Sequence, residues 1–142
     1  PPGTGDAQLT LSQRVPLAGA VIVSTPQEVA LADVRKAINM FNKVHVRVLG
    51  MIENMSTFAC PHCGEHTDIF GHGGAAATAK ALEIDFLGEI PLIPAIRETS
   101  DGGQPIVATD PDSAAARAYR EIAAAVLERL TPAAAGPRIV IQ

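Results

Sequence analysis

The only two cysteines of the chain, Cys60 and Cys63, lie in the run Cys-Pro-His-Cys-Gly. Two thiolates at this spacing can both turn toward one ion. Pro61 fixes one backbone angle of the turn, and Gly64 lets backbone amides approach the sulfur atoms, which tunes a thiolate–metal bond. A closed site needs four such ligands, so either two copies of the chain share one centre or the pair does redox chemistry alone.

Four kinds of chemistry compete for this pair. An iron-sulfur or zinc centre could bridge two subunits, and a mononuclear zinc site could recruit His62, His66 or His72. A thiol-disulfide oxidoreductase also uses Cys-x-x-Cys, and a pair of unreactive thiols is the fourth interpretation. Thioredoxin-like enzymes start a long helix at the first cysteine, and Gly64 directly after the motif argues against such a helix. The pattern therefore favours a metal-binding turn.

Three further segments could bind a ligand. Asn54 follows a buried run of apolar residues, at the carboxyl end of an expected strand, where open α/β sheets bind ligands. Its amide offers a donor and an acceptor to a purine edge, although an Asn that satisfies a local turn is the simpler interpretation. The segment Pro91–Pro94 follows the next strand, so the two could flank one base. The loop Pro1–Asp6 could place glycine amides against a phosphate, and a plain turn is the alternative there.

Alternating strands and helices would position these segments. Continuous apolar runs predict buried parallel strands, and the helices between them would cover both faces of the sheet. Thr25 would cap the first long helix in a capping box with Glu28, with Pro26 at its first position. Segment 53–74 is expected to be a long irregular loop, and loops of that length are usually functional. The expected strands are 17–24, 46–52 and 86–90, and the expected helices are 9–15, 25–41, 75–82, 95–102 and a last one capped by Asp112 or Ser113 and ending near Leu130.

Composition narrows the possible partners. The 142 residues suit one domain with a core of small aliphatic side chains, since there is no Trp. The net charge is −4, and the sequence contains no Lys/Arg cluster. We therefore expect neither nucleic acid nor an anionic membrane as a partner. No apolar run approaches the roughly 20 residues of a membrane span. Two cysteines without disulfide patterning favour a reducing, cytoplasmic location.

Taken together and in order, the motifs resemble the Mrp/ApbC family of iron-sulfur cluster carriers. These are ATPases of the deviant-Walker P-loop class, related to MinD-type ATPases. The resemblance extends from Pro1 to about Leu130. Its motifs are Pro-Pro-Gly-Thr-Gly-Asp, Val-Ile-Val-Ser-Thr-Pro-Gln-Glu-Val-Ala, Gly-Met-Ile-Glu-Asn-Met-Ser, Cys-Pro-His-Cys-Gly, Ile-Phe-Gly-His-Gly-Gly and Leu-Gly-Glu-Ile-Pro-Leu-Ile-Pro-Ala-Ile-Arg.

The resemblance implies a role for each motif. Asn54 would pair with the adenine edge of ATP, with Pro91 and its neighbours against the base. Cys60 and Cys63 of two subunits would hold one [4Fe-4S] cluster in a homodimer that serves apo iron-sulfur proteins. ATP with magnesium would drive closure between subunits and so gate the cluster. The residues that resemble the end of the switch II loop are Gly3, Thr4, Gly5 and Asp6.

The chain also departs from the family pattern. No Gly-x-x-x-x-Gly-Lys-Ser/Thr occurs, and segment 71–74 lacks the Lys-Ser/Thr that would engage phosphates and magnesium. We therefore expect residues 1–130 to be the C-terminal part of a P-loop NTPase-type three-layer α/β sandwich, mainly parallel, without its first strands and phosphate loop. Residues 131–142 would be a flexible tail. Such a chain is not expected to hydrolyse ATP alone, and a non-catalytic, zinc-bridged dimerisation module is the alternative function.

Overall fold

The computed structural model describes residues 5–130, along which strands and helices alternate. The expected tail, residues 131–142, lies outside the described residues. Within the described residues, no helix has both the length and the apolar character that crossing a bilayer requires. The elements are α1 (Asp6–Arg14), β1 (Ala20–Ser24), α2 (Glu28–Lys43), β2 (Val48–Ala59), β3 (His66–Thr67), α3 (Gly74–Ala81), β4 (Phe86–Leu92), α4 (Pro94–Asp101), α5 (Ile106–Thr109) and α6 (Ala114–Leu130).

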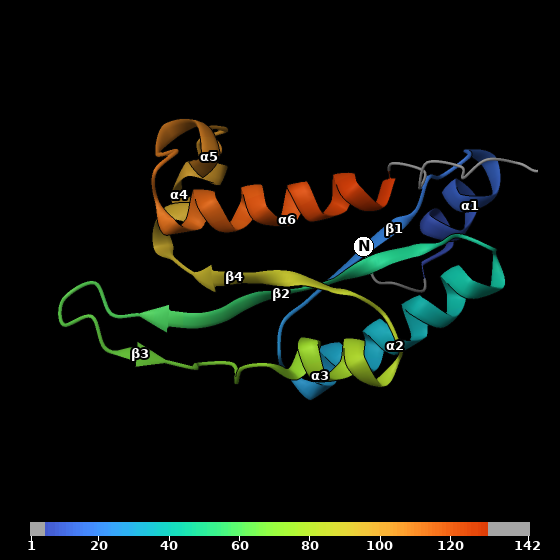
Figure 1. Ribbon diagram of the computed structural model, residues 1–142, viewed down its shortest axis with the longest axis horizontal. Helices are drawn as coiled ribbons and strands as arrows, with labels where there is room; N and C mark the ends of the chain where they lie inside the picture. Colours follow the sequence, from blue (N-terminus) through green and yellow to red (C-terminus); the bar gives the residue numbers. More distant parts are fainter. Residues whose placement is uncertain (1–4, 131–142) are drawn as a thin grey trace, which may run out of the picture.

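The long strand β2 is the centre of the sheet (Figure 1). It pairs in parallel with β1 on one side and with β4 on the other, and its far end pairs antiparallel with the short β3. The register aligns Ser24 of β1 and Glu89 of β4 with Glu53 of β2. The parallel strands therefore end at one edge of the sheet, as their apolar runs predicted, and β3 makes the sheet mixed.

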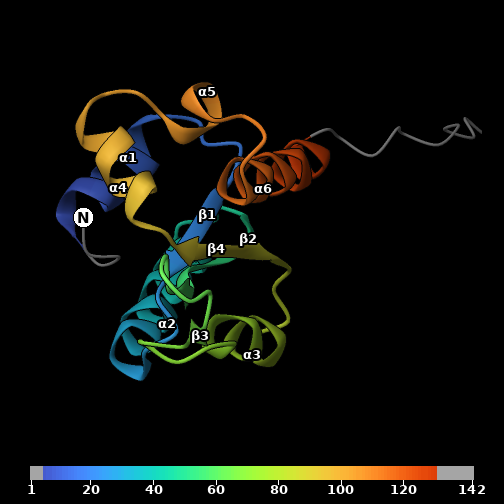
Figure 2. The same cartoon turned by 90° about the vertical axis from the view of Figure 1, so that its left-hand side faces the viewer.

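Helices cover both faces of this sheet, which confirms the predicted three-layer arrangement (Figure 2). The helices α2 and α3 lie on one face and α6 on the other, with α4 and α5 beside α6. Consecutive residues of β2 separate the two cores, because side chains alternate along a strand. Met51 packs with Leu31, Ile38 and Ala79, whereas Ile52 packs with Ile122.

The helix ends confirm two of three predicted caps. The Ser113 hydroxyl accepts the amide of Ala116 at 3.2 Å, and Gly102 ends α4. The capping box at Thr25 is wrong. The helix starts at Glu28, so its carboxylate is at the first helical position rather than the third and pairs with Arg35 at 3.4 Å. The Thr25 hydroxyl donates to the Gln27 side chain instead.

The segment 53–74 differs most from the prediction, because it is only partly irregular. The strand β2 does not end at Ile52 but continues to Ala59, and the chain returns through β3. Pairing of Phe58 with Thr67 and of Ala59 with His66 makes this segment a β-hairpin. We call residues 54–72 the cysteine hairpin. It projects beyond the carboxyl edge of the sheet, at the left of Figure 1.

Candidate metal centre and the strand ends beside it

The two cysteines lie in the turn at the end of the cysteine hairpin. The amide of Cys60 donates to the Glu65 carbonyl and the amide of Gly64 donates to the Cys60 carbonyl, both at 2.9 Å. Gly64 adopts a φ of 73°, the left-handed conformation that glycine allows without strain. The hydroxyl of Thr57 donates to Asp68 across the hairpin at 3.0 Å. The two cysteines therefore lie in a turn that is held by backbone and side-chain hydrogen bonds.

The electrostatics of the turn favour a thiolate at Cys60. The pKa of its thiol is lowered because the backbone amides of Cys63 and His62 donate to its sulfur, with a smaller contribution from the Cys63 thiol. Thiolates are the form in which cysteine binds metals. Both cysteines are free, Cys60 being half-buried and Cys63 exposed. This is the arrangement expected of a metal-binding turn, since neither cysteine is fully buried.

The structure also brings the two predicted base-binding residues to one place. Asn54 of β2 is the register partner of Ile90 in β4, and Pro91 is the next residue along β4. The Asn54 side chain currently accepts the amide of Met55 at 3.0 Å, and Met55 has a positive φ of 57°. The local-turn interpretation of Asn54 thus describes its present contact, while its amide group remains half-exposed.

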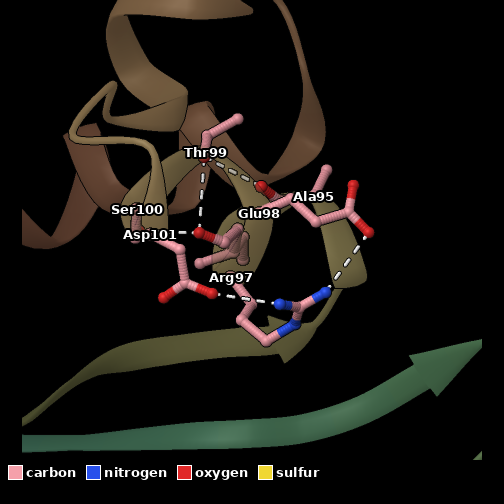
Figure 3. A network of polar contacts seen from close by, with 7 residues as sticks. Ala95, Arg97, Glu98, Thr99, Ser100 and Asp101 are labelled. Carbon is pink, nitrogen blue, oxygen red and sulfur yellow. Dashed lines mark hydrogen bonds and ion pairs between the residues drawn. The ribbon is translucent and has the colours of Figure 1, made fainter.

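The helix that follows Pro91 is held by its own side chains. No side chain caps the start of α4, and none of its residues is fully buried. Figure 3 shows that Arg97 pairs with Asp101 at 3.0 Å and that the Thr99 hydroxyl donates to the Ala95 carbonyl at 2.8 Å. These contacts stabilise the short helix α4, which begins at Pro94, the last residue of the Pro91–Pro94 segment.

A third group at the strand ends was not predicted from the sequence. Glu53 is fully buried, and its two carboxylate oxygens accept the amides of Gly73 and Ala75, each at 2.8 Å. His72 pairs with Glu89 of β4 at 2.8 Å. The pKa of His72 is raised above its usual value, chiefly because Glu89 accepts its hydrogen bond. In the sequence, Glu53 lies between an apolar run and Asn54. That position indicated only the start of a loop and gave no sign that the carboxylate would be buried.

The predicted switch II residues fall partly outside the described residues, since Gly3 and Thr4 precede them. Gly5 precedes the first residue of α1, where its carbonyl accepts the amides of Gln8 and Leu9, and Asp6 opens the helix. Figure 1 places α1 and the cysteine hairpin at opposite ends of the molecule. The structure therefore unites Asn54 with Pro91 and Cys60 with Cys63, and it does not bring Gly5 or Asp6 to them.

Known proteins are similar to this chain in sequence and in fold. A family model described as "ParA: NUBPL iron-transfer P-loop NTPase" matches residues 1–127. The iron-sulfur cluster transfer protein NUBPL of Dictyostelium discoideum is 60% identical over 130 residues, which are 92% of this chain and 40% of the relative. The chain thus spans less than half the length of this curated relative.

Two solved structures agree with the sequence comparison. A nucleotide-binding protein of Archaeoglobus fulgidus in complex with ADP, with cobalt found by PIXE, superposes with a TM-score of 0.64 at 50% identity. That match covers 73% of this chain and 43% of the other. The cell division ATPase MinD of Pyrococcus furiosus gives a TM-score of 0.63 at 26% identity, covering 78% and 43%. The chain is thus a MinD-like α/β unit and belongs to the NUBPL family of iron-transfer P-loop NTPases.

Proposed function

We propose that this chain holds an iron-sulfur cluster as cargo on Cys60 and Cys63, shared between two copies, and passes it to apoproteins. The observation that carries the proposal is the turn itself. It exposes two thiols on an amide-lined frame, with the Cys60 thiolate stabilised by the backbone of Cys63 and His62. Two thiolates complete half of a four-thiolate site, so a second copy supplies the rest.

Membership of the family supports this cargo. The D. discoideum relative is named an iron-sulfur cluster transfer protein, and the family description names iron transfer. The exposed position of the hairpin suits transfer, because an acceptor protein can approach the cluster without unfolding the sheet. Free thiols also suit the reducing, cytoplasmic location expected from the sequence.

Nucleotide binding is the second part of the proposal. Asn54 and Pro91 lie on adjacent strands at the carboxyl edge, the position at which open α/β sheets bind nucleotides. ATP with magnesium in the whole protein would contact these residues through its adenine. This chain has no Gly-x-x-x-x-Gly-Lys-Ser/Thr loop to hold the phosphates. By itself it is therefore expected not to hydrolyse ATP.

Anaerobic reconstitution with ferrous iron and sulfide tests the cargo. The chain should acquire a broad thiolate-to-iron absorbance near about 400 nm. Cys60→Ala and Cys63→Ala should each abolish it. His62→Ala is the matched control, because it changes the same turn without removing a sulfur, and it should keep the absorbance. Full colour in Cys60→Ala contradicts the bridging pair.

The competing functions give different results in the same experiment. A colourless protein with one zinc for every two chains would indicate the zinc-bridged dimerisation module. A reversible two-electron titration of the dithiol, with no metal taken up, would indicate a thiol-disulfide oxidoreductase. Phosphate release from ATP by the purified chain, with contaminating ATPases excluded, would contradict the expected lack of hydrolysis.

A further inference from the structure

The cysteine hairpin begins and ends at a single buried carboxylate. Glu53 directly precedes it, and the chain returns to Glu53 at Gly73. One oxygen of Glu53 accepts the Gly73 amide and the other accepts the Ala75 amide, each at 2.8 Å. The backbone that leaves the sheet and the backbone that returns are therefore joined by one side chain.

A second contact fixes the returning backbone to the neighbouring strand. His72, the last residue of the hairpin, pairs with Glu89 of β4 at 2.8 Å. The ligand-type atoms of Glu53, His72 and Glu89 all lie within 4.8 Å of one another. We call these three residues the base cluster. It connects the hairpin to β2 and β4 at once.

Up to Phe58 the hairpin pairs with β4, but its outer part beyond that point has little support of its own. Its ladder consists of two residue pairs, Phe58 with Thr67 and Ala59 with His66. Residues 61–69 are all exposed, so no buried apolar contact orders the turn. A two-stranded ribbon of this kind is marginal in water unless something else holds it. The orientation of this outer part therefore depends on the pairing of β2 with β4 and on the contacts that hold the returning backbone at the base.

The base cluster also adjoins the residues proposed to contact a nucleotide. Glu53 directly precedes Asn54, and Glu89 lies two residues before Pro91. We propose that Glu53, His72 and Glu89 are positioning residues that set the Cys60–Cys63 turn relative to the strand ends. This inference rests on the proposed function, in which that turn holds the cluster. It identifies the contacts through which a change at the strand ends would reach the thiols.

The same three residues resemble a cation site, but their contacts favour a structural role. Both oxygens of Glu53 already accept backbone amides, and the His72 nitrogen is paired with Glu89. Cobalt(II) offered to a Cys60→Ala/Cys63→Ala double variant should therefore not bind. Stoichiometric cobalt binding by that variant, lost again on adding His72→Leu, would overturn the positioning role in favour of a second metal site.

A pair of substitutions at His72 tests the inference directly. His72→Leu removes the bond to Glu89, whereas His72→Gln keeps an N–H donor near the same position. The His72 side chain is 45% exposed, so both variants should fold. Glu28→Gln is the matched control, because it breaks an exposed ion pair on α2, far from the turn in the chain. Hydrogen exchange is followed at the Cys60 and Gly64 amides, with the buried Met51 amide as the reporter of global unfolding.

His72→Leu should speed exchange at Cys60 and Gly64 by about fivefold, the loss expected for one hydrogen bond, and leave Met51 unchanged. Cobalt binding to the two cysteines, read from thiolate charge transfer, should weaken by a similar factor. His72→Gln should restore both, and Glu28→Gln should change neither. Unchanged exchange at Cys60 and Gly64, or equal acceleration at Met51, would overturn the inference.

The outcomes separate this inference from the proposed function. If the chain takes up no iron-sulfur cluster but His72→Leu still loosens the turn and weakens cobalt binding, the cargo proposal fails and the positioning role stands. If the chain takes up the cluster and His72→Leu alters neither exchange nor cobalt affinity, the cargo proposal stands and the positioning role fails.

Discussion

Backbone amides stabilise two anionic side chains in this molecule. Cys60 receives the amides of Cys63 and His62, and Glu53 receives those of Gly73 and Ala75. Hydrogen bonds from neutral donors favour the charged form of a group without adding a side-chain cation. At Cys60 this leaves the thiolate available to a metal, and at Glu53 it allows a carboxylate to be fully buried. Each depends on backbone donors within hydrogen-bonding distance, so single substitutions test both.

Replacing Glu53 should destabilise the fold. Glu53→Gln keeps one oxygen, but its NH₂ group would face a backbone N–H, leaving a buried donor without an acceptor. We expect the free energy of unfolding to fall by about 1–3 kcal/mol in urea denaturation. The exposed Glu28→Gln should change it by no more than about 0.5 kcal/mol. Equal values for the two variants would contradict the burial of Glu53.

Stability should depend on pH through His72. The pKa of its imidazole is raised chiefly by the hydrogen bond to Glu89. Desolvation opposes this shift, and the carboxylates of Glu89, Glu53 and Asp68 add to it. The folded protein thus binds the proton of His72 more tightly than the unfolded chain does. Its contribution is fully present below the unfolded pKa of about 6.5 and is lost as pH rises through the higher folded pKa.

His72→Leu should therefore lower the urea midpoint at about pH 5.5 more than at about pH 8.5. The effect should be small, because His72 and Glu89 are both about half exposed and the pair is screened by solvent. An NMR titration provides the direct check, with His72 titrating above the free-imidazole value. A larger loss at the higher pH would reverse the sign and contradict the pairing with Glu89.

At the scale of elements, the cysteine hairpin shows where sequence patterns stop being informative. The apolar run ends at Ile52, so the sequence pattern predicted that the strand would end there. In the structure, β2 continues to Ala59, seven residues further. It can do so because β4 and then β3 supply hydrogen-bonding partners, while buried Ser56 donates to the Ile90 carbonyl at 3.3 Å. Pairing with segments distant in the chain leaves no local hydrophobic period to detect, and a shift in register between Asn54 and Phe58 disrupts it further.

The start of α3 is the element most sensitive to added volume. A Cβ at Gly74 would lie 2.4 Å from the Pro26 carbonyl oxygen and 3.0 Å from Leu31, and the backbone atom cannot move aside easily. Gly74→Ala should lower the free energy of unfolding by about 1–3 kcal/mol, although Ala is the better helix former. Gly102→Ala is the control, since its nearest neighbours are 3.5 Å away and its φ is negative. It should be neutral or slightly stabilising, and a matching loss there would contradict the packing argument.

For the whole molecule, the sequence was sufficient to predict the three parallel strands and the order of the longer helices, but not the short β3 or α5. Long apolar runs and amphipathic helices carry that information locally, as the position of Met51 between two helices and Ile52 against α6 illustrates. It also suggested that Asn54 and the Pro91 segment would lie near one another, and the register places Asn54 opposite Ile90, the residue before Pro91. It did not predict the Glu53 contacts or the start of α2, since both depend on which backbone amides tertiary packing leaves near a carboxylate.

The number of thiols makes assembly a property of the whole molecule. Under the proposed function, each chain supplies two of the four thiolates that a closed site needs. Cys60 and Cys63 lie in the turn of the projecting cysteine hairpin. We therefore expect the cluster-loaded protein to sediment at twice the mass of one chain, with four iron ions for every two chains, and the metal-free protein as a monomer. Cys63→Ala should remain monomeric under loading conditions, whereas His62→Ala should dimerise. A loaded monomer would require ligands other than the partner's thiols, and a metal-free dimer would show that another surface, rather than the cluster, joins the two copies.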